Sequence, residues 1–310
     1  MSKKKKRQHY VWRRYLRSWS NSKDLIPSLI KFEKKIATTN LMNVAQEKFY
    51  YSLQEFSKEE EIALKGIISN LSNQDTEVIF QEYYELFTSY SKLKRAIKNN
   101  EIPESKLVEI EDKLDLMKSN LMEDFHSDFE SFGEKLMQIK TVEDLKFLDD
   151  DESELKTIIF LCFQYVRTKR MQNIFTQKFQ GHYKILPKYF HILSFVLATG
   201  MANGFRNYKK TKFVFIENIS STDFITSDQP IINLKEDERD EKGNVISLEF
   251  FYPLNPTIAL KVHYNDGNKY GHLKIKEKEV KMFNNIIFKK SEDFIFAKNS
   301  KQLEEYKNCL

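Results

Sequence analysis

A stretch near the middle of the chain, LCFQYVRTKR, carries polar side chains among apolar ones. Gln164, Arg167 and Arg170 follow one another at intervals of three residues, which places them near one side of a helix. A guanidinium group is a planar fork that can hold a phosphate or a carboxylate through paired hydrogen bonds. Because an unpaired buried arginine is costly, the alternative is that Arg167 pairs with an internal glutamate or with helix carbonyl groups.

A second polar group lies in FITSDQPIIN, residues 224–233. Thr226 and Ser227 follow a short apolar run, and hydroxyl side chains at such positions commonly form turns, so turn hydrogen bonds are their simpler interpretation. Asp228 is the better functional candidate. A carboxylate at the end of a strand can orient a histidine or bind a metal ion.

The third group is QHYVWRRYLRSW, residues 8–19, directly after the basic run KKKKR. Disordered arms are poor in Trp and Tyr, so Tyr10–Trp19 is predicted to dock on the core with Arg13 and Arg14 facing solvent. The basic run Lys3–Arg7 is predicted to be a solvated tail, with a nuclear-localisation patch as a weaker alternative.

Charge is concentrated at the start of the chain. The first 35 residues hold 12 Lys and Arg against two acidic residues, a balance of +10, whereas the whole chain of 310 residues is +5. The remainder therefore carries −5. A protein that follows a nucleic-acid backbone across a wide face would spread its basic residues further, so one short segment is expected to meet an anion.

The hydrophobic period changes near residue 205. Before it, apolar residues at helical spacing predict helices at 41–71, 75–99, 104–139, 153–180 and 187–204. After residue 210 the apolar runs are short and β-rich: KFVFIE, FITS, PIINL, VISLEFFYPL, TIALKVHY, HLKIKE and DFIFAK, with turn signals at 242–244 and 265–268.

This pattern predicts an α+β fold. A helical N-terminal two-thirds would pack against one face of a mostly antiparallel C-terminal β-sheet. We expect a single unit over 1–310, mainly helical over 1–205 and mainly β over 206–310. The charge-laced helix at 104–139 is typical of a surface or dimer helix, so a homodimer or a partner protein is expected.

Several classes of protein are excluded. The motifs GxGxxG, GxxxxGK[ST], HExxH, GxSxG and CxxC are absent, and the six histidines never occur at i,i+3 or i,i+4. The chain is therefore not a recognisable NTPase, zinc hydrolase or dehydrogenase. Cys162 and Cys309 show no disulfide or metal-ligand spacing, which fits a reducing cytoplasm. No apolar run is long enough for a membrane span.

Four motifs in this order and at these separations resemble the bacterial family known as domain of unknown function 4238. They are His9-Tyr10-Val11 with Tyr15-Leu16-Arg17, Gln164 with Arg167-Thr168, Phe224 to Pro230, and Tyr252 to Pro256. Trp12 replaces the usual Pro and Trp19 the usual Phe, so the entry into the segment is less rigid. The resemblance implies a full-length unit and a set of polar residues to test together, and the family name implies no activity.

The leading hypothesis is a nuclease-like phosphodiester hydrolase. In it His9 acts as general acid or base, Asp228 orients it or holds a divalent ion such as Mg²⁺ or Mn²⁺, and Arg167 stabilises phosphoryl charge. Substrate binding is assigned to the other polar residues, Arg17, Tyr15, Gln164, Arg170, Thr226 and Ser227. Uncharacterised bacterial families often occur among phage-defence genes, and this association suggests a toxic RNase acting in the cytoplasm.

Two alternatives belong to other classes. The same residues can bind a nucleotide or a nucleic acid, RNA in particular, without turnover. They can also form an internal salt-bridge network that only stabilises the fold.

Overall fold

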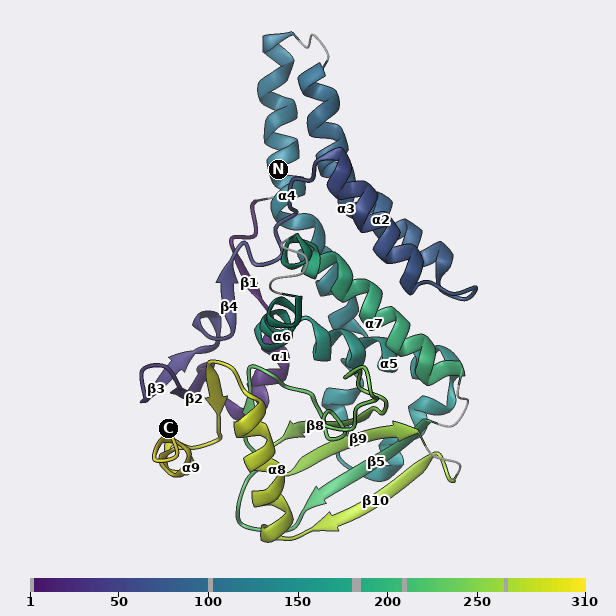
Figure 1. Ribbon diagram of the computed structural model, residues 1–310. Helices are drawn as coiled ribbons and strands as arrows, with labels where there is room; N and C mark the ends of the chain where they lie inside the picture. Colours follow the sequence, from purple (N-terminus) through teal and green to yellow (C-terminus); the bar gives the residue numbers. More distant parts are fainter. Residues whose placement is uncertain (1–2, 100–102, 180–184, 208–210, 265–266) are drawn as a thin grey trace.

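The computed structural model describes residues 3–99, 103–179, 185–207, 211–264 and 267–310. Figure 1 shows long helices packed on one face of a twisted β-sheet and a further helix across its other face. The fold is α+β, as the change in hydrophobic period predicts. None of the described helices is both long enough and apolar enough to cross a membrane.

The long helices lie between residues 58 and 207. They are α2 (Lys58–Leu71), α3 (Glu77–Asn99), α4 (Glu104–Ser131), α5 (Asp151–Val166), α6 (Lys169–Phe179) and α7 (Phe190–Asn207). Short helical turns are η2 (Leu41–Asn43), η3 (Leu136–Gln138), η4 (Val142–Asp149) and η5 (Leu186–Tyr189). The outer parts of α3 and α4 project from the body as a hairpin (Figure 1).

Three of the predicted helices have the wrong bounds. The helix predicted at 104–139 ends at Ser131, and only the short turn η3 follows it before residue 139. Residues 41–57 are not one helix with 58–71, because Ala45 and Phe49 take positive φ angles of 46° and 58°. The helix predicted at 153–180 is interrupted after Val166. Thr168 begins a new helix there, since its hydroxyl accepts a hydrogen bond from the Met171 amide at 3.4 Å. Residue 180 lies outside the described residues.

The largest sheet has the strand order β10-β5-β9-β8-β7. Its strands are β5 (Thr211–Asn218), β7 (Ile232–Asn233), β8 (Glu249–Asn255), β9 (Ile258–Tyr264) and β10 (Tyr270–Ile275). Every neighbouring pair is antiparallel except β10 and β5, which run parallel. The prediction of a mostly antiparallel sheet is confirmed, and the turn signal at 265–268 falls partly outside the described residues.

Both faces of this sheet are covered. Successive side chains of a strand point to opposite faces, and along β5 Phe213 and Phe215 join the core on the side of α5 and α7. Val214 and Ile216 join a smaller core with α8 (Glu277–Lys290) and α9 (Ser300–Lys307). The sequence pattern predicts one covered face and does not predict these two helices.

The first 50 residues are not mainly helical. Apart from α1 (Arg13–Leu16) and the turns η1 (Arg17–Trp19) and η2, they form four strands, β1 (Arg7–His9), β2 (Leu25–Ile30), β3 (Lys35–Asn40) and β4 (Gln46–Lys48). A second sheet has the order β3-β2-β11-β6, with β11 (Phe294–Phe296) and β6 (Thr226–Ser227) coming from the C-terminal third. These pairings join distant parts of the chain, which local periodicity cannot show.

A close approach at the end of α4 gives a test of the packing. A Cβ atom on Gly133 would lie 2.5 Å from the buried ring of Phe160, whereas one on Gly66, inside α2, would meet nothing within 4 Å. We expect Gly133→Ala to lower the free energy of unfolding by about 2 kcal/mol through overpacking. Gly66→Ala should raise it by about 1 kcal/mol through helix propensity. Urea unfolding of both variants checks this, and equal effects would contradict the packing described.

Candidate functional site

Arg167 lies at the end of α5 and is only 1% exposed. Its Nη2 donates to Oε1 of Glu130, on α4, at 2.6 Å and to Oε1 of Gln164 at 3.1 Å. The carbonyl oxygen of Arg167 accepts a hydrogen bond from the Tyr50 hydroxyl at 3.4 Å. The internal glutamate that the simpler interpretation of Arg167 requires is therefore present.

Other polar groups surround this ion pair. We call the set the Arg167 cluster: Tyr51, Glu123, His126, Glu130, Gln164, Arg167 and Tyr252. The charge of Arg167 acts on the pKa of Tyr51, Glu123, His126 and Tyr252, which places them all near the guanidinium. The ring of His126 lies 4.1 Å from that of Tyr51, measured between centroids.

The hydrogen bonds of the cluster are incomplete. Among the described residues no partner is found for seven of its buried atoms: Tyr51 Oη, Glu123 Oε2, Nδ1 and Nε2 of His126, Gln164 Nε2, Arg167 Nε and Tyr252 Oη. Each unsatisfied buried polar group costs about 1–3 kcal/mol, so native proteins contain few of them. Their concentration around one guanidinium makes the Arg167 cluster the candidate functional site.

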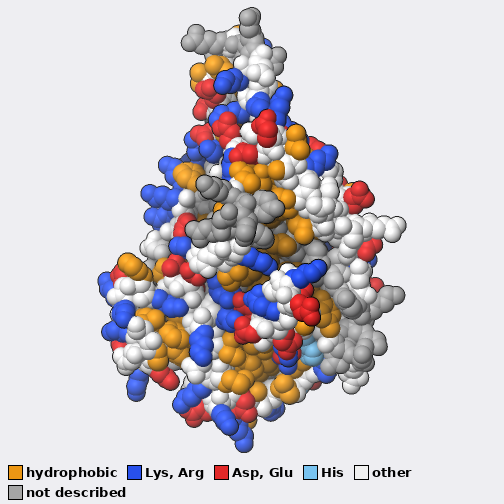
Figure 2. Space-filling view, viewed as in Figure 1, with side chains coloured by type: hydrophobic (Ala, Val, Ile, Leu, Met, Phe, Trp, Pro, Cys, Tyr) orange, Lys and Arg blue, Asp and Glu red, His pale blue; other side chains and the backbone are white. Residues whose placement is uncertain are grey.

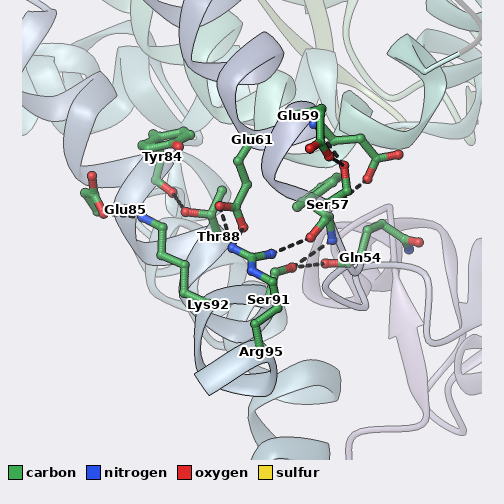
Figure 3. A network of polar contacts seen from close by, with 12 residues as sticks. Gln54, Ser57, Glu59, Glu61, Tyr84, Glu85, Thr88, Ser91, Lys92 and Arg95 are labelled. Atoms are coloured by element: carbon green, nitrogen blue, oxygen red, sulfur yellow. Dashed lines mark hydrogen bonds and ion pairs between the residues drawn. The ribbon is translucent and has the colours of Figure 1, made fainter. Parts of the chain in front are cut away.

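A second ion pair shows the difference. In Figure 3 the guanidinium of Arg95 donates to both carboxylate oxygens of Glu61, each at 2.7 Å, and to the carbonyl oxygen of Phe56 at 2.6 Å. No polar atom of this network is among the unsatisfied buried atoms of the described residues. Arg95 therefore joins α2, α3 and the preceding loop, and it serves as a structural reference for Arg167.

Burial sets the protonation of the cluster. It raises the pKa of Glu123 to about 7 against the opposing charge of Arg167, and it raises the pKa of Glu130 as well. It also lowers the pKa of His126 well below the usual value, so this ring is neutral. Glu123 can thus exchange a proton near neutral pH, as a general acid or base must.

His9 is half-buried, and the charge of Arg167 acts on its pKa. Its Nε2 is 3.3 Å from the carbonyl oxygen of Leu41, and burial lowers the pKa of His9 to about 4. The charges of Arg13 and Arg167 act on the pKa of both His9 and Glu130. Among the described residues no hydrogen bond or ion pair joins His9 to Glu123 or Glu130.

Two predicted substrate-binding arginines lie away from the cluster. Arg17 is half exposed and pairs with Asp24 at 3.3 Å. Arg170 pairs with Glu236 at 2.7 Å, in a network that also holds Lys290. The break between α5 and α6 turns Arg170 away from Arg167, so the single helical face expected for the two is wrong.

Asp228 supports a turn. Its Oδ1 accepts from the amide of Glu292 at 2.9 Å, and its Oδ2 accepts from the amides of Asp293 and Phe294 at 2.6 and 3.1 Å. Burial raises the pKa of Asp228 to about 6 although the three amides oppose it. Within the described chain no hydrogen bond joins Asp228 to His9.

The remaining predicted residues connect motifs. The hydroxyl of Tyr15 is 2.5 Å from that of Thr226, and the ring of Tyr15 stacks on Tyr252 of the cluster with centroids 4.8 Å apart. The hydroxyl of Ser227 bonds the amide and carbonyl of Gln229, which confirms the turn expected there.

Further contacts bring the four motifs together. The Thr168 hydroxyl is hydrogen-bonded to the side chain of Gln229, and the Trp19 indole donates to the Phe224 carbonyl at 2.8 Å. Trp19 is fully buried, which confirms that Tyr10–Trp19 docks on the core. The motifs therefore meet as one support beside the Arg167 cluster.

The basic run at the start of the chain is not a free tail. The backbone amide of Lys5 donates to Oδ1 of Asn120 at 2.8 Å, and the amide group of Asn120 donates to the Lys3 carbonyl at 3.1 Å. Lys5 also pairs with Asp124 at 2.6 Å. Lys3–Arg7 are exposed, as predicted, but the segment is bound along α4 and is not a free tail, because the helix presents acidic and amide side chains along its path.

Sequence reasoning did not assign five members of the cluster to the site: Tyr51, Tyr252 and three residues of α4. Glu123, His126 and Glu130 follow one another at i, i+3 and i+7, one face of a helix, but the charged residues between them made this stretch resemble a surface helix. That spacing was the available signal. In the described part of the chain no group of three His, Cys, Asp or Glu side chains is arranged to hold a metal ion, and the divalent ion stays a prediction.

The raised pKa of Glu123 has a measurable effect on stability. A carboxyl group with a folded pKa of about 7 against a usual 4.5 adds stability below pH 4.5, and this is lost as the pH rises through 7. Gln cannot ionise, so the unfolding free energy of Glu123→Gln relative to wild type should rise by about 2 kcal/mol between pH 5 and 8. Urea unfolding at both pH values checks it. Glu109→Gln, on the exposed part of α4, is the control. If the unfolding free energies of both variants showed the same small change with pH, the pKa of Glu123 would not be raised.

Comparison with known proteins identifies the family alone. The chain matches, over residues 7–301, the family described as Protein of unknown function (DUF4238). Neither a curated protein nor a solved structure matches the chain. The match covers nearly the full length, and it confirms the resemblance seen in the four motifs. The protein belongs to the DUF4238 family.

Proposed function

We propose that the protein is a nuclease-like enzyme that cleaves phosphodiester bonds at the Arg167 cluster. The observation that carries the proposal is a buried guanidinium beside unsatisfied donors and a carboxyl group, Glu123, that titrates near pH 7. Perturbed ionisable groups gathered around a buried cation are typical of catalytic sites. Arg95, whose side chain is 28% exposed, leaves no buried polar atom unpaired among the described residues, in contrast to Arg167.

The donors fit a phosphoryl group. Arg167 Nε and Gln164 Nε2 are both unsatisfied among the described residues, and they lie on adjacent turns at the end of α5. Donors of this kind stabilise charge that develops on the oxygens of a reacting phosphate. Arg167 remains positive in this role although Glu130 balances part of its charge.

The acid and the base have suitable protonation states. His9, with a pKa of about 4, is neutral at physiological pH and can accept a proton from the attacking hydroxyl. Glu123, with a pKa of about 7, still holds a proton there and can donate it to the leaving oxygen. Asp228 takes no part in this scheme except to hold the turn before β11.

RNA is the substrate we favour. The 2′-oxygen would attack phosphorus, the bond from phosphorus to the 5′-oxygen would break, His9 would take the 2′-hydroxyl proton and Glu123 would protonate the 5′-oxygen. The products are a 2′,3′-cyclic phosphate and a free 5′-hydroxyl. This transfer needs only the acid, base and guanidinium described, and a divalent ion would be an addition to it.

The surface near the cluster suits a polyanion. Figure 2 shows Lys and Arg side chains along the flank where the N-terminal segment lies. Lys4, Lys5, Arg7 and Arg14 are exposed there. The proposal extends to a toxic RNase of a bacterial defence system, acting in the cytoplasm with a second copy or a partner protein.

One observation favours a second candidate. Arg167 is almost fully buried, and a site this closed can also retain a nucleotide without turning it over. Such a binding module would give saturable, salt-dependent binding of RNA and no product.

The proposal predicts the behaviour of matched arginine variants. Wild-type protein should cleave a fluorogenic RNA oligonucleotide and leave a cyclic phosphate end. Arg167→Met and Glu123→Gln should each lower kcat/KM by about 100-fold or more, because they remove charge stabilisation and the proton donor. Arg95→Met, which breaks an ion pair outside the cluster, should keep activity in whatever fraction remains folded by circular dichroism.

The pH profile separates catalysis from folding. The rate should fall below about pH 4, where His9 becomes protonated, and above about pH 7, where Glu123 loses its proton. Binding without any product supports the second candidate instead. Equal activity of the folded Arg95→Met and Arg167→Met proteins would overturn the proposal.

A further inference from the structure

The first residues of the chain form a strap across α4. We define the strap as Lys3–Gln8. Its end is held firmly, because the buried side chain of Gln8 donates to the Ser119 carbonyl at 2.6 Å and accepts from the Tyr51 amide at 2.6 Å. The Lys6 carbonyl accepts from the Phe49 amide at 2.9 Å. Gln8 therefore anchors the strap directly beside Tyr51, a member of the Arg167 cluster.

The outer part of the strap is held mainly by exposed charges. Lys4 pairs with Asp115 and Lys5 with Asp124, and all four side chains are between 40% and 55% exposed. Exposed ion pairs contribute little to stability and weaken with salt. Two hydrogen bonds to the buried side chain of Asn120 also join Lys3 and Lys5 to α4. The strap is thus firmly held at one end and weakly held at the other.

The weakly held part lies against the turn of α4 that carries Glu123. Lys5 contacts Asn120 and Asp124, which flank Glu123 in the helix. The charge of Lys5 also acts on the pKa of both Glu123 and Glu130. The strap therefore covers the edge of the cluster where its two carboxyl groups are only partly buried.

We infer that a nucleic-acid backbone opens this strap by taking Lys4 and Lys5 from Asp115 and Asp124. Closely spaced phosphates compete well for lysines because their binding releases condensed counterions. Lys4 and Lys5 then pair with phosphates of the polyanion. The strap separates from α4, and Gln8 remains bound as its anchor. The inference rests on the proposed function: substrate binding and access to the Arg167 cluster become one event.

Hydrogen exchange measured by mass spectrometry tests the opening without any turnover. The probe is a short single-stranded DNA, which lacks the 2′-hydroxyl that the proposed cleavage needs. Adding it to the full-length protein should raise the exchange rate of the segment 3–6, in which the Lys5 amide donates to Asn120, about 10-fold. An uncharged morpholino oligomer of the same base sequence should leave the rate unchanged, since it carries no phosphate charge.

Two variants make the cause specific. Asp115→Asn combined with Asp124→Asn should give the faster exchange with no DNA present. The matched control is Glu109→Gln, which breaks the exposed pair of Glu109 with Lys113 on the same helix and should leave the strap protected.

The outcomes separate this inference from the proposed function. An exchange rate that does not change with DNA overturns the inferred opening of the strap, even if RNA is cleaved. Equal exchange rates in the double variant and in Glu109→Gln overturn it as well. Faster exchange in a protein that never cleaves RNA supports the strap and removes only the catalytic role.

Discussion

The buried ion pair between Arg167 and Glu130 is the interaction around which this protein is arranged. Moving a guanidinium out of water has a large desolvation free energy. Its interactions with one carboxylate and one amide oxygen offset only part of that free energy. The rest of the neighbourhood consists of groups that respond to the charge, Tyr51, Glu123 and His126 among them. The unsatisfied Nε of Arg167 is one of the observations on which the proposed site rests.

Several features of the chain follow from the position of Arg167. Helix α5 ends at Val166, just before Arg167, and α6 begins at Lys169. Between them, the hydroxyl of Thr168 is hydrogen-bonded to the side chain of Gln229, in the turn after β6. On the other side, the N-terminal segment packs Tyr15 between Thr226 and Tyr252. The four sequence motifs are therefore mostly the support of the site, and the ionisable groups come from α4 and from His9. Asp228 belongs to this support, because its carboxylate accepts hydrogen bonds from three backbone amides.

Much of the fold could be predicted from the sequence because its signals are local. The period of two in KFVFIE and TIALKVHY marks strands, and the apolar spacing around Phe80 and Phe87 marks a helix. The pairing of β2 with β11 joins residues more than 260 positions apart, and no local pattern reports it. The same limit applied to the site: Gln164 and Arg167 were visible as polar residues on an apolar helix. Their partner Glu130 was hidden among the surface charges of α4.

The protonation of Glu123 tests the account most directly. Carbon-13 NMR of labelled glutamate carboxyl groups can follow the titration of Glu123, assigned by its loss in Glu123→Gln. The account predicts a midpoint near pH 7 in the wild-type protein, and a higher midpoint in Arg167→Met, because the guanidinium charge lowers the pKa of this carboxyl group. A midpoint near 4.5 that does not move in Arg167→Met would show that Glu123 is an ordinary surface residue, and that no acid–base site lies beside Arg167.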